Sequence, residues 1–222
     1  FLRISTQMVE TIVLHQKIDK KAAKEKAIEM LKLAGIPAPE KRIDQYPHQF
    51  SGGMRQRVMI AMGLSCNPEI LIADEPTSAL DVTIQAQILE LMRELTRKLG
   101  TAVILITHSL GVVAGMCDTI CVMYAGRIVE RGRTEEIFES PRHPYTQGLI
   151  RSVPRLDQET KERLYSIPGQ PPNVIDLPDC CPFYPRCERA MDICKKKYPP
   201  VVSFENNQSA SCWLYGKEAQ NV

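Results

Sequence analysis

The stretch Ile70-Leu71-Ile72-Ala73-Asp74-Glu75 decides the fold of this chain. Four apolar residues in a row have the length of a buried strand, and two carboxylates followed by Pro76 close it. A second apolar run, Ala102 to Ile106, follows an amphipathic pattern over Val82 to Leu99 that ends at Gly100. Apolar strands without alternation, separated by a helix, predict a parallel sheet covered on both faces. We therefore expect an α/β fold.

Helical patterns precede this sheet and a hairpin follows it. Asp19 is placed as the N-cap of a helix from Lys20 to Ala34. A further helix is expected from Ser51 to Ser65. The residues from Thr119 to Arg131 predict a hairpin that turns near Ala125-Gly126, which would give the sheet an antiparallel edge.

Composition sets the class of protein. The chain has 222 residues, 44% of them hydrophobic, with 28 Lys and Arg against 26 Asp and Glu. These fractions exclude disordered and fibrous classes. A net charge of +2 gives no electrostatic reason to expect nucleic acid as a partner. No apolar stretch approaches the roughly 20 residues of a membrane-spanning helix. Of 16 prolines, 11 lie in residues 141–222, which predicts a loop-rich extension there.

The first candidate site is the helix start Ser51-Gly52-Gly53. Two glycines before a helix allow backbone N–H groups to approach an anion closely, and the helix dipole favours a phosphate there. An ordinary capped helix explains the same three residues equally simply.

The second candidate site lies at the ends of the two strands. Asp74 is suited to hold Mg²⁺ directly or through water, and Glu75 to activate a water molecule as general base. His108 follows the second strand and would reach a phosphoryl group held over the same edge of the sheet. The alternatives are a strand that ends in solvated acids and a structural histidine.

The order of these elements resembles that of the ATP-binding cassette (ABC) ATPases. Ser51-Gly52-Gly53-Met54 matches the signature motif of that family, with Met54 where Gln is commonest. Ile70 to Asp74 matches the Walker B strand, and Glu75 the catalytic glutamate. Ser78 to Asp81 matches the D-loop and His108 the switch histidine. The resemblance implies a P-loop NTPase-like core with a mostly parallel sheet and a helical subdomain.

The resemblance also implies a mechanism in which two cassettes enclose two ATP molecules. The signature motif would contact the nucleotide of the partner cassette. Asp74 would orient Mg²⁺, Glu75 would activate water, and His108 would stabilise the γ-phosphate. Asp81 would couple the two sites across the interface.

One feature departs from that family. The P-loop pattern G-x-x-x-x-G-K-[ST] does not occur in the 222 residues, so Phe1 is interpreted as a truncation point inside the helical subdomain. We expect the isolated chain to lack ATPase activity, and a sheet without its central strand to expose apolar surface.

Five of the eight cysteines lie between Cys180 and Cys212. Their spacing lacks the C-x2-4-C pairs of structural zinc sites, while four thiolates on proline-rich loops are compatible with a [4Fe–4S] cluster. The spacing alone therefore does not distinguish a zinc site from an iron–sulfur cluster.

The extension resembles the C-terminal region of ATPase subunits from oligopeptide and dipeptide importers. The resemblance is carried by His143-Pro144-Tyr145-Thr146 and by Cys181-Pro182-Phe183-Tyr184-Pro185-Arg186-Cys187. In that subfamily such cysteines are associated with an iron–sulfur cluster. The implied ligands are Cys181, Cys187, Cys194 and Cys212, with Cys180 as the spare and zinc as the alternative metal.

Together these features predict three segments: 1–66 as the rest of the helical subdomain, 67–140 as the C-terminal part of the ATPase core, and 141–222 as the extension. The predicted function is that of an ATPase subunit of a peptide importer, peripheral on the cytoplasmic face of the membrane. Its expected partners are a second ATPase subunit, the permease and, indirectly, an extracytoplasmic peptide-binding protein. A non-transport ABC ATPase and an inactive metal-binding interaction module are the alternatives.

Overall fold

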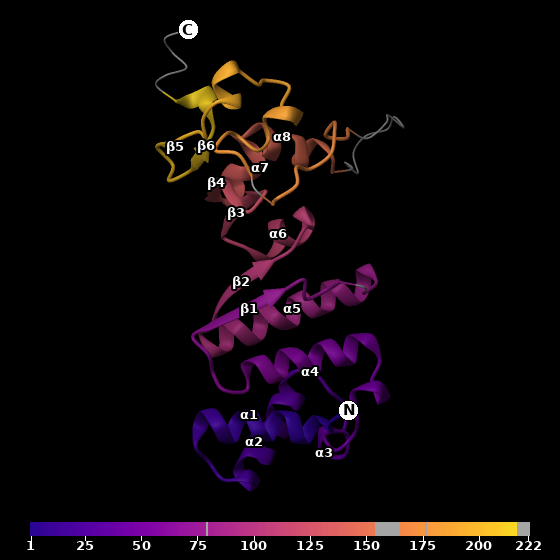
Figure 1. Cartoon of the computed structure of the whole chain (residues 1–222). Coiled ribbons are helices and arrows are strands. Elements are labelled where there is room, and N and C mark those ends of the chain that lie inside the picture. Colours follow the sequence, from indigo (N-terminus) through magenta and orange to yellow (C-terminus); the bar gives the residue numbers. More distant parts are fainter. Residues whose placement is uncertain (79, 154–164, 176, 217–222) are drawn as a thin grey trace. The chain divides into compact units, whose positions relative to one another are not determined.

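The computed structural model describes residues 1–78, 80–153, 165–175 and 177–216 (Figure 1). The chain forms two compact units, Phe1–Val112 and Val113–Val222, which are described separately. No helix of the described residues combines the length and the apolar character needed to cross a membrane.

Helices make up the first part of unit 1. Asp19 Oδ1 accepts hydrogen bonds from the backbone N–H groups of Lys21 and Ala22, at 2.8 and 3.1 Å, which confirms the predicted N-cap. The buried faces of the first two helices carry Met8, Ile12 and Leu31, and these helices pack on each other. The elements are α1 (Ile4–Gln16), α2 (Lys20–Leu33), α3 (Pro39–Arg42), the 3₁₀ turn η1 (Pro47–Gln49) and α4 (Gly52–Leu64).

The sheet of unit 1 consists of β1 (Ile70–Asp74) and β2 (Ala102–Ile106), joined by α5 (Val82–Leu99). The strands are parallel, and Asp74 lies opposite Ile106 at their shared carboxyl edge. α5 packs on α4, which in turn packs on α2. The predicted strand–helix–strand order is confirmed, and α6 (Leu110–Met116) follows it.

One face of this sheet stays open in the described part of the chain. Ile70, Ile72, Ile104 and Ile106 are 48 to 65% exposed, while Ala73 points to the covered side. The predicted cover on both faces is therefore absent from the described residues. The sheet therefore presents the apolar surface that the sequence predicted.

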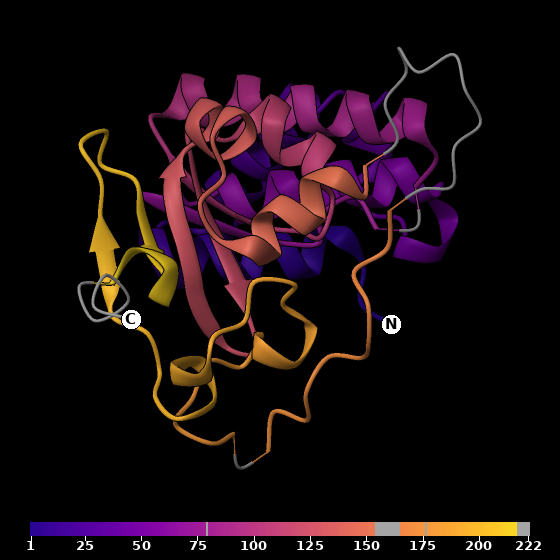
Figure 2. The same ribbon diagram turned by 90° about the horizontal axis from the view of Figure 1, so that it is seen from above.

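The predicted hairpin is confirmed in unit 2 as β3 (Thr119–Tyr124) and β4 (Arg127–Arg133). Ala125 and Gly126 form its turn, both with positive φ, of 49° and 75°. Its place in the fold differs from the prediction: the hydrogen-bonded order is β3-β4-β6-β5, separate from the β1–β2 sheet. The strands β5 (Val201–Ser203) and β6 (Ser209–Ser211) come from the extension and form a short yellow hairpin in Figure 2.

Aromatic rings make the core of unit 2. The ring centroids of Tyr124, Tyr145 and Phe183 lie 4.6 to 5.4 Å apart, and His143 is 5.8 Å from Phe183. This cluster joins the end of β3 to α8 and to the cysteine-bearing loops. The remaining elements are α7 (Thr134–Glu139), α8 (Pro144–Arg151), η2 (Tyr184–Arg186), η3 (Asp192–Lys195) and η4 (Trp213–Tyr215).

A buried carboxylate on β4 ties this core together. Glu130 is 1% exposed. Its Oε1 accepts hydrogen bonds from the Arg142 backbone N–H at 2.6 Å and from Gln208 Nε2 at 2.9 Å, and its Oε2 accepts one from the His143 backbone N–H at 2.9 Å. Glu130 thus fixes the start of α8 and the loop before β6 on one strand.

Candidate functional site

The acidic pair lies at the carboxyl edge of the unit 1 sheet, as predicted. Asp74 is the last residue of β1, and the backbone N–H of Glu75 donates to Ile106 O at 2.9 Å. Glu75 has φ of 46°, in the left-handed region that residues other than glycine rarely adopt. Such strain persists where surrounding contacts hold it, often at functional sites.

His108 and Ser78 hold the two oxygens of the Glu75 carboxylate. His108 Nδ1 lies 2.7 Å from Oε1, and Ser78 Oγ donates to Oε2 at 2.9 Å. These bonds, with that of His108 the stronger influence, hold the pKa of Glu75 below its usual value. The group keeps a negative charge and faces solvent, which suits a carboxylate that orients water.

The sequence analysis assigned Ser78 to the D-loop but did not predict its hydrogen bond to Glu75. The Ser78 backbone N–H also donates to Glu75 O, at 3.1 Å, so a tight turn returns the serine to the glutamate. The signal was the i, i+3 spacing of Glu75 and Ser78 around Pro76, which favours such a turn.

The glycine-led helix start forms as predicted. Ser51 caps α4, and its Oγ accepts from the Met54 backbone N–H at 3.3 Å. A Cβ on Gly53 would lie 2.9 Å from Ile84 Cγ2, so the absence of a side chain lets α4 approach α5 closely. Gly52 leaves ordinary contact distance to Leu80, at 3.6 Å.

Asp81 serves as the N-cap of α5. Its Oδ1 accepts from the Ile84 backbone N–H at 2.9 Å. The starts of α4 and α5 therefore lie close to each other. No hydrogen bond or ion pair joins Ser51 to Asp74 or Glu75 in the described part of unit 1.

The four predicted cysteine ligands gather in unit 2. Burial raises the pKa of the Cys181 thiol to about 11 and that of Cys212 to about 12, and the neighbouring cysteines of the set contribute to both rises. Burial likewise raises the pKa of Cys187, with a contribution from Cys194. Cys181 and Cys194 belong to the buried core of unit 2, and Cys187 packs against it.

Backbone N–H groups lie near each of these sulfurs. Those of Phe183 and Tyr184 act on Cys181, that of Arg189 on Cys187 and that of Leu214 on Cys212, and each lowers the thiol pKa. The Met191 N–H donates to Cys194 Sγ at 3.5 Å. Such donors favour thiolates. By contrast, Cys180 Sγ only donates to a carbonyl, that of Cys181 at 4.0 Å.

The sulfurs are not drawn together around one point. Among the described residues, no group of three or more His, Cys, Asp or Glu side chains is arranged to hold a metal ion. The predicted ligand set is therefore not arranged as a metal site in the described part of the chain.

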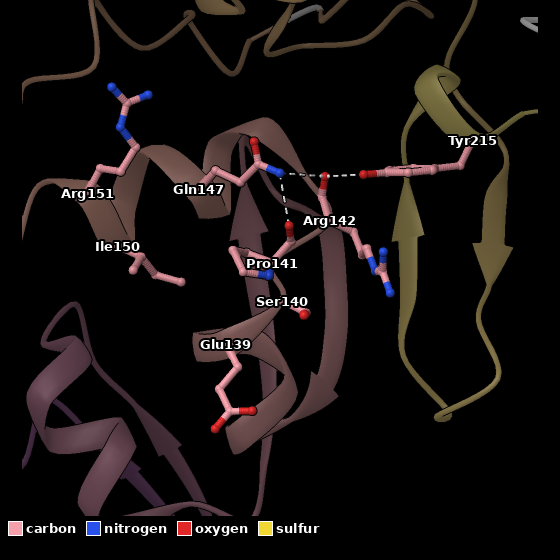
Figure 3. A pocket seen from close by; sticks show the side chains of 8 residues that line it. All are labelled: Glu139, Ser140, Pro141, Arg142, Gln147, Ile150, Arg151 and Tyr215. Carbon is pink, nitrogen blue, oxygen red and sulfur yellow. Dashed lines mark hydrogen bonds between the residues drawn. The ribbon is translucent and has the colours of Figure 1, made fainter.

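A shallow hollow of about 480 Å³ also lies in unit 2 (Figure 3). The side chains of Arg142 and Arg151 point apart in Figure 3, so they do not converge on one anion. Gln147 Nε2 donates to Pro141 O at 2.9 Å, and Tyr215 Oη to Arg142 O at 3.1 Å. None of the predicted site residues is in its lining, which consists of Glu139, Ser140, Pro141, Arg142, Gln147, Ile150, Arg151 and Tyr215.

Two family descriptions match the sequence. Residues 2–78 match the ABC transporter family, and residues 129–194 match the family described as oligopeptide/dipeptide transporter, C-terminal region. The first match contains the signature helix and β1, and the second contains three of the four predicted cysteine ligands.

Curated relatives align over nearly the whole chain. The oligopeptide transport ATP-binding protein OppD of Bacillus subtilis is 52% identical over 100% of this chain and 62% of its own length. OppD of Salmonella typhimurium is 52% identical over 96% of this chain and 63% of its own. The dipeptide transport ATP-binding protein DppD of Bacillus subtilis is 52% identical, over 100% and 66%. The chain thus spans slightly less than two thirds of these relatives.

Solved structures share the fold. CbiO1 of Clostridium perfringens, part of the ABC transporter complex CbiONQ, superimposes with a TM-score of 0.54 and 32% identity, over 63% of this chain and 55% of that one. The ATP-binding cassette MJ0796, a dimer bound to ADP and Pi, gives 0.52 and 28%, over 60% and 57%. The ABC ATPase fold predicted from the sequence is confirmed.

Proposed function

We propose that this chain, which belongs to the ABC transporter family, forms part of an ATP-hydrolysing subunit that energises the import of oligopeptides or dipeptides. The contact between Glu75 and His108 at the carboxyl edge of β1 and β2 carries the proposal. It joins the two residues whose roles the family resemblance assigns to hydrolysis, directly beside Asp74.

Each of the site residues would have a separate role in phosphoryl transfer. Asp74 would orient Mg²⁺ at the end of β1, where an oxygen ligand meets the bound phosphates. Glu75 would orient and activate the attacking water, and His108 would hold Glu75 and stabilise the charge that develops on the γ-phosphate.

The signature segment would serve a second cassette. Ser51, Gly52, Gly53 and Met54 present the start of α4, where backbone N–H groups favour a phosphate. No bond joins Ser51 to the acids in the described part of unit 1, which agrees with a role toward a partner's nucleotide. The dimeric state of MJ0796 supports this arrangement. Asp81, at the start of α5, would couple the two sites.

The proposed assembly follows from the relatives. The partners would be a second ABC ATPase subunit, identical or related, and the permease, with an extracytoplasmic peptide-binding protein acting indirectly. The subunit would be peripheral on the cytoplasmic face of the membrane, without a role for nucleic acid. We assign residues 1–66 to the helical subdomain, 67–140 to the ATPase core and 141–222 to the extension.

A chimera tests this function, because the 222 residues contain no P-loop pattern. The part of Bacillus subtilis OppD outside the match is joined to this chain to complete a cassette. Glu75→Gln should lower ATP turnover by at least about 100-fold while ATP binding persists. Glu69→Gln, a control just before β1, should leave turnover unchanged. Turnover that survives Glu75→Gln, or that the isolated chain shows unaided, would contradict the proposal.

We also propose that Cys181, Cys187, Cys194 and Cys212 hold a [4Fe–4S] cluster. The N–H groups near all four sulfurs support this set over Cys180, because such donors stabilise metal-bound thiolates. A single zinc ion would bring its ligands within about 4 Å of each other, since Zn–S bonds are ≈ 2.3 Å long. Four iron atoms would space the ligands further apart than a single zinc ion does. When bound, the cluster would supply a cross-link between the loops.

Metal analysis distinguishes the alternatives. Anaerobically purified chain should be brown and contain iron and acid-labile sulfide in equal amounts. Cys194→Ser should abolish both, whereas Cys180→Ser should retain them. A colourless protein with one zinc per chain would replace the cluster by the zinc alternative.

A further inference from the structure

The four cysteines of the proposed metal site are not held equally. Cys181, Cys194 and Cys212 are buried, and the Cys181 backbone N–H donates to Cys194 O at 3.0 Å. Cys187 is only half-buried and follows the single 3₁₀ turn η2. Cys187 is therefore the least buried of the four, and the contacts of its neighbours in sequence help to hold its loop.

Arg186, the residue before Cys187, makes three hydrogen bonds to distant parts of unit 2. Its Nε donates to Pro168 O at 2.8 Å and its Nη2 to Ile167 O at 3.2 Å. Its Nη1 donates to Tyr124 Oη at 3.3 Å. A planar guanidinium with several donors in fixed directions suits such a junction, which an ammonium group would fill incompletely.

Glu188, the residue after Cys187, contacts the same segment. Tyr165 Oη donates to Glu188 Oε1 at 3.1 Å. Residues 165–168, here called the strap, are thus bound from both sides of Cys187. Cys187 thus lies between Arg186, which binds backbone carbonyls of the strap, and Glu188, which binds the side chain of Tyr165.

The strap is seated on the body of unit 2. A Cβ on Gly148 of α8 would lie 2.9 Å from Ile167 Cγ1, so only glycine admits Ile167 there. Arg151 lies over the Tyr165 ring, 4.0 Å from its centroid. Ile167 and Cys187 both pack on the core cluster that contains Cys181 and Cys194.

We propose that Arg186 is the positioning residue of the cysteine site, which orients Cys187 toward the other three cysteines by binding the strap. This inference rests on the proposed metal site for its purpose, since Arg186 itself touches no metal. The strap is seated on the core of unit 2, and Arg186 connects Cys187 to it through hydrogen bonds. Glu188 adds one further hydrogen bond to the strap.

Site-resolved alkylation of the 222-residue chain tests the link, as purified and again after chelation. Arg186→Met should raise the iodoacetamide rate at Cys187 at least about tenfold, the change expected when a charge-assisted hydrogen bond no longer opposes local opening. Rates at Cys181, Cys194 and Cys212 should stay unchanged. Arg186→Lys, which keeps a donor, should rescue part of the effect, and Tyr165→Phe should give a smaller rise.

Arg127→Met is the matched control. Arg127 lies over the Tyr198 ring, 4.1 Å from its centroid, so the substitution removes an arginine contact of unit 2 that does not involve the strap. It should leave Cys187 unaffected. An unchanged Cys187 rate in Arg186→Met, or an equal rise at all four cysteines, would overturn the inference.

Metal content separates this inference from the proposed metal site. If the parent chain binds iron, Arg186→Met should lose it and Arg186→Lys should retain most of it; full retention in Arg186→Met overturns the positioning role. If the parent chain binds no metal, the metal proposal fails, while the selective Cys187 rate still decides whether Arg186 orients that residue.

Discussion

Two glutamates, one in each unit, are held by their surroundings in different ways. Glu75 faces solvent, and two side chains, His108 and Ser78, hold its oxygens. Glu130 is 1% exposed, and two of its three donors are backbone N–H groups. The partners of the exposed carboxylate are side chains that water can replace. The buried carboxylate binds mainly backbone N–H groups, whose positions the fold determines.

The difference predicts opposite consequences of substitution. Removing Glu75 should leave the fold intact, because its partners return to water. Removing Glu130 should leave buried donors without acceptors, which is the more severe loss. The substitutions below test or refine this contrast.

The largest effect is expected from Glu130→Ala. The loss of a buried carboxylate that serves three donors should lower the free energy of unfolding of unit 2 by about 3–5 kcal/mol. Urea denaturation followed by the fluorescence of Trp213, the single tryptophan, measures it. Glu205→Gln, at an exposed position, is the control. A loss below that of an ordinary surface substitution would break the contrast between the glutamates.

The next effect concerns His143, which lies beside the Glu130 network. Burial lowers the pKa of His143 from 6.5 to about 4, and its Nδ1 accepts from the Tyr145 backbone N–H at 3.1 Å. The unfolded chain therefore takes up the proton first as the pH falls. The stabilisation is complete above pH 6.5 and decreases toward pH 4, by about 3 kcal/mol in total.

His143→Asn isolates this dependence. Asparagine is a good N-cap and can accept the same N–H without titrating between pH 6.5 and 4. The variant should unfold in urea with a weaker pH dependence than the parent chain. His48→Asn, at an exposed position of unit 1, should not change the dependence. Identical slopes in the parent and His143→Asn would show that His143 titrates normally.

The sequence predicted the exposed site better than the buried one, for a physical reason. Asp74, Glu75 and His108 follow two apolar strands, and parallel strands bring their carboxyl ends to one edge. Glu130 lies in a strand of alternating charges that suggests a solvated surface. Its partner Gln208 is 78 residues away, in a segment without periodicity. The pairing of β4 with the three-residue strand β6 could not be predicted either, because β6 lies in the same segment without periodicity.

The cysteines were predicted from the sequence less fully than the site of Glu75 and more fully than the contacts of Glu130. Their identity as a set followed from resemblance to a family, and the described residues do not arrange them as a metal site. The roles of Arg186 and the strap could not be predicted, because Ile167 and Pro168 precede Arg186 by 19 and 18 residues and contact it through backbone carbonyls, which any sequence supplies.

A smaller effect is expected where α4 meets α5. Gly53→Ala would place a methyl group 2.9 Å from Ile84 Cγ2 and should destabilise unit 1 by about 1–3 kcal/mol. Ile84→Leu, which has no Cγ2, should relieve most of this loss in the double variant. Thermal unfolding by circular dichroism measures both. Gly111→Ala, where a Cβ meets no atom within 4 Å, should not destabilise the chain. Strict additivity of Gly53→Ala and Ile84→Leu would exclude the close contact.

The smallest and most specific effect is expected from Ser78→Ala. The hydrogen bonds of His108 and Ser78 keep the pKa of Glu75 low, so they are intact above its ordinary value and lost as the pH falls through the lowered one. Without Ser78 the Glu75 pKa should rise, though less than in His108→Ala. Carbon-13 NMR of the carboxylate measures the shift, and Ser109→Ala is the control. Because Glu75 faces solvent, stability should hardly change. If Ser78→Ala destabilised unit 1 as much as Glu130→Ala destabilises unit 2, Glu75 would be a structural residue and the contrast between the two glutamates would disappear.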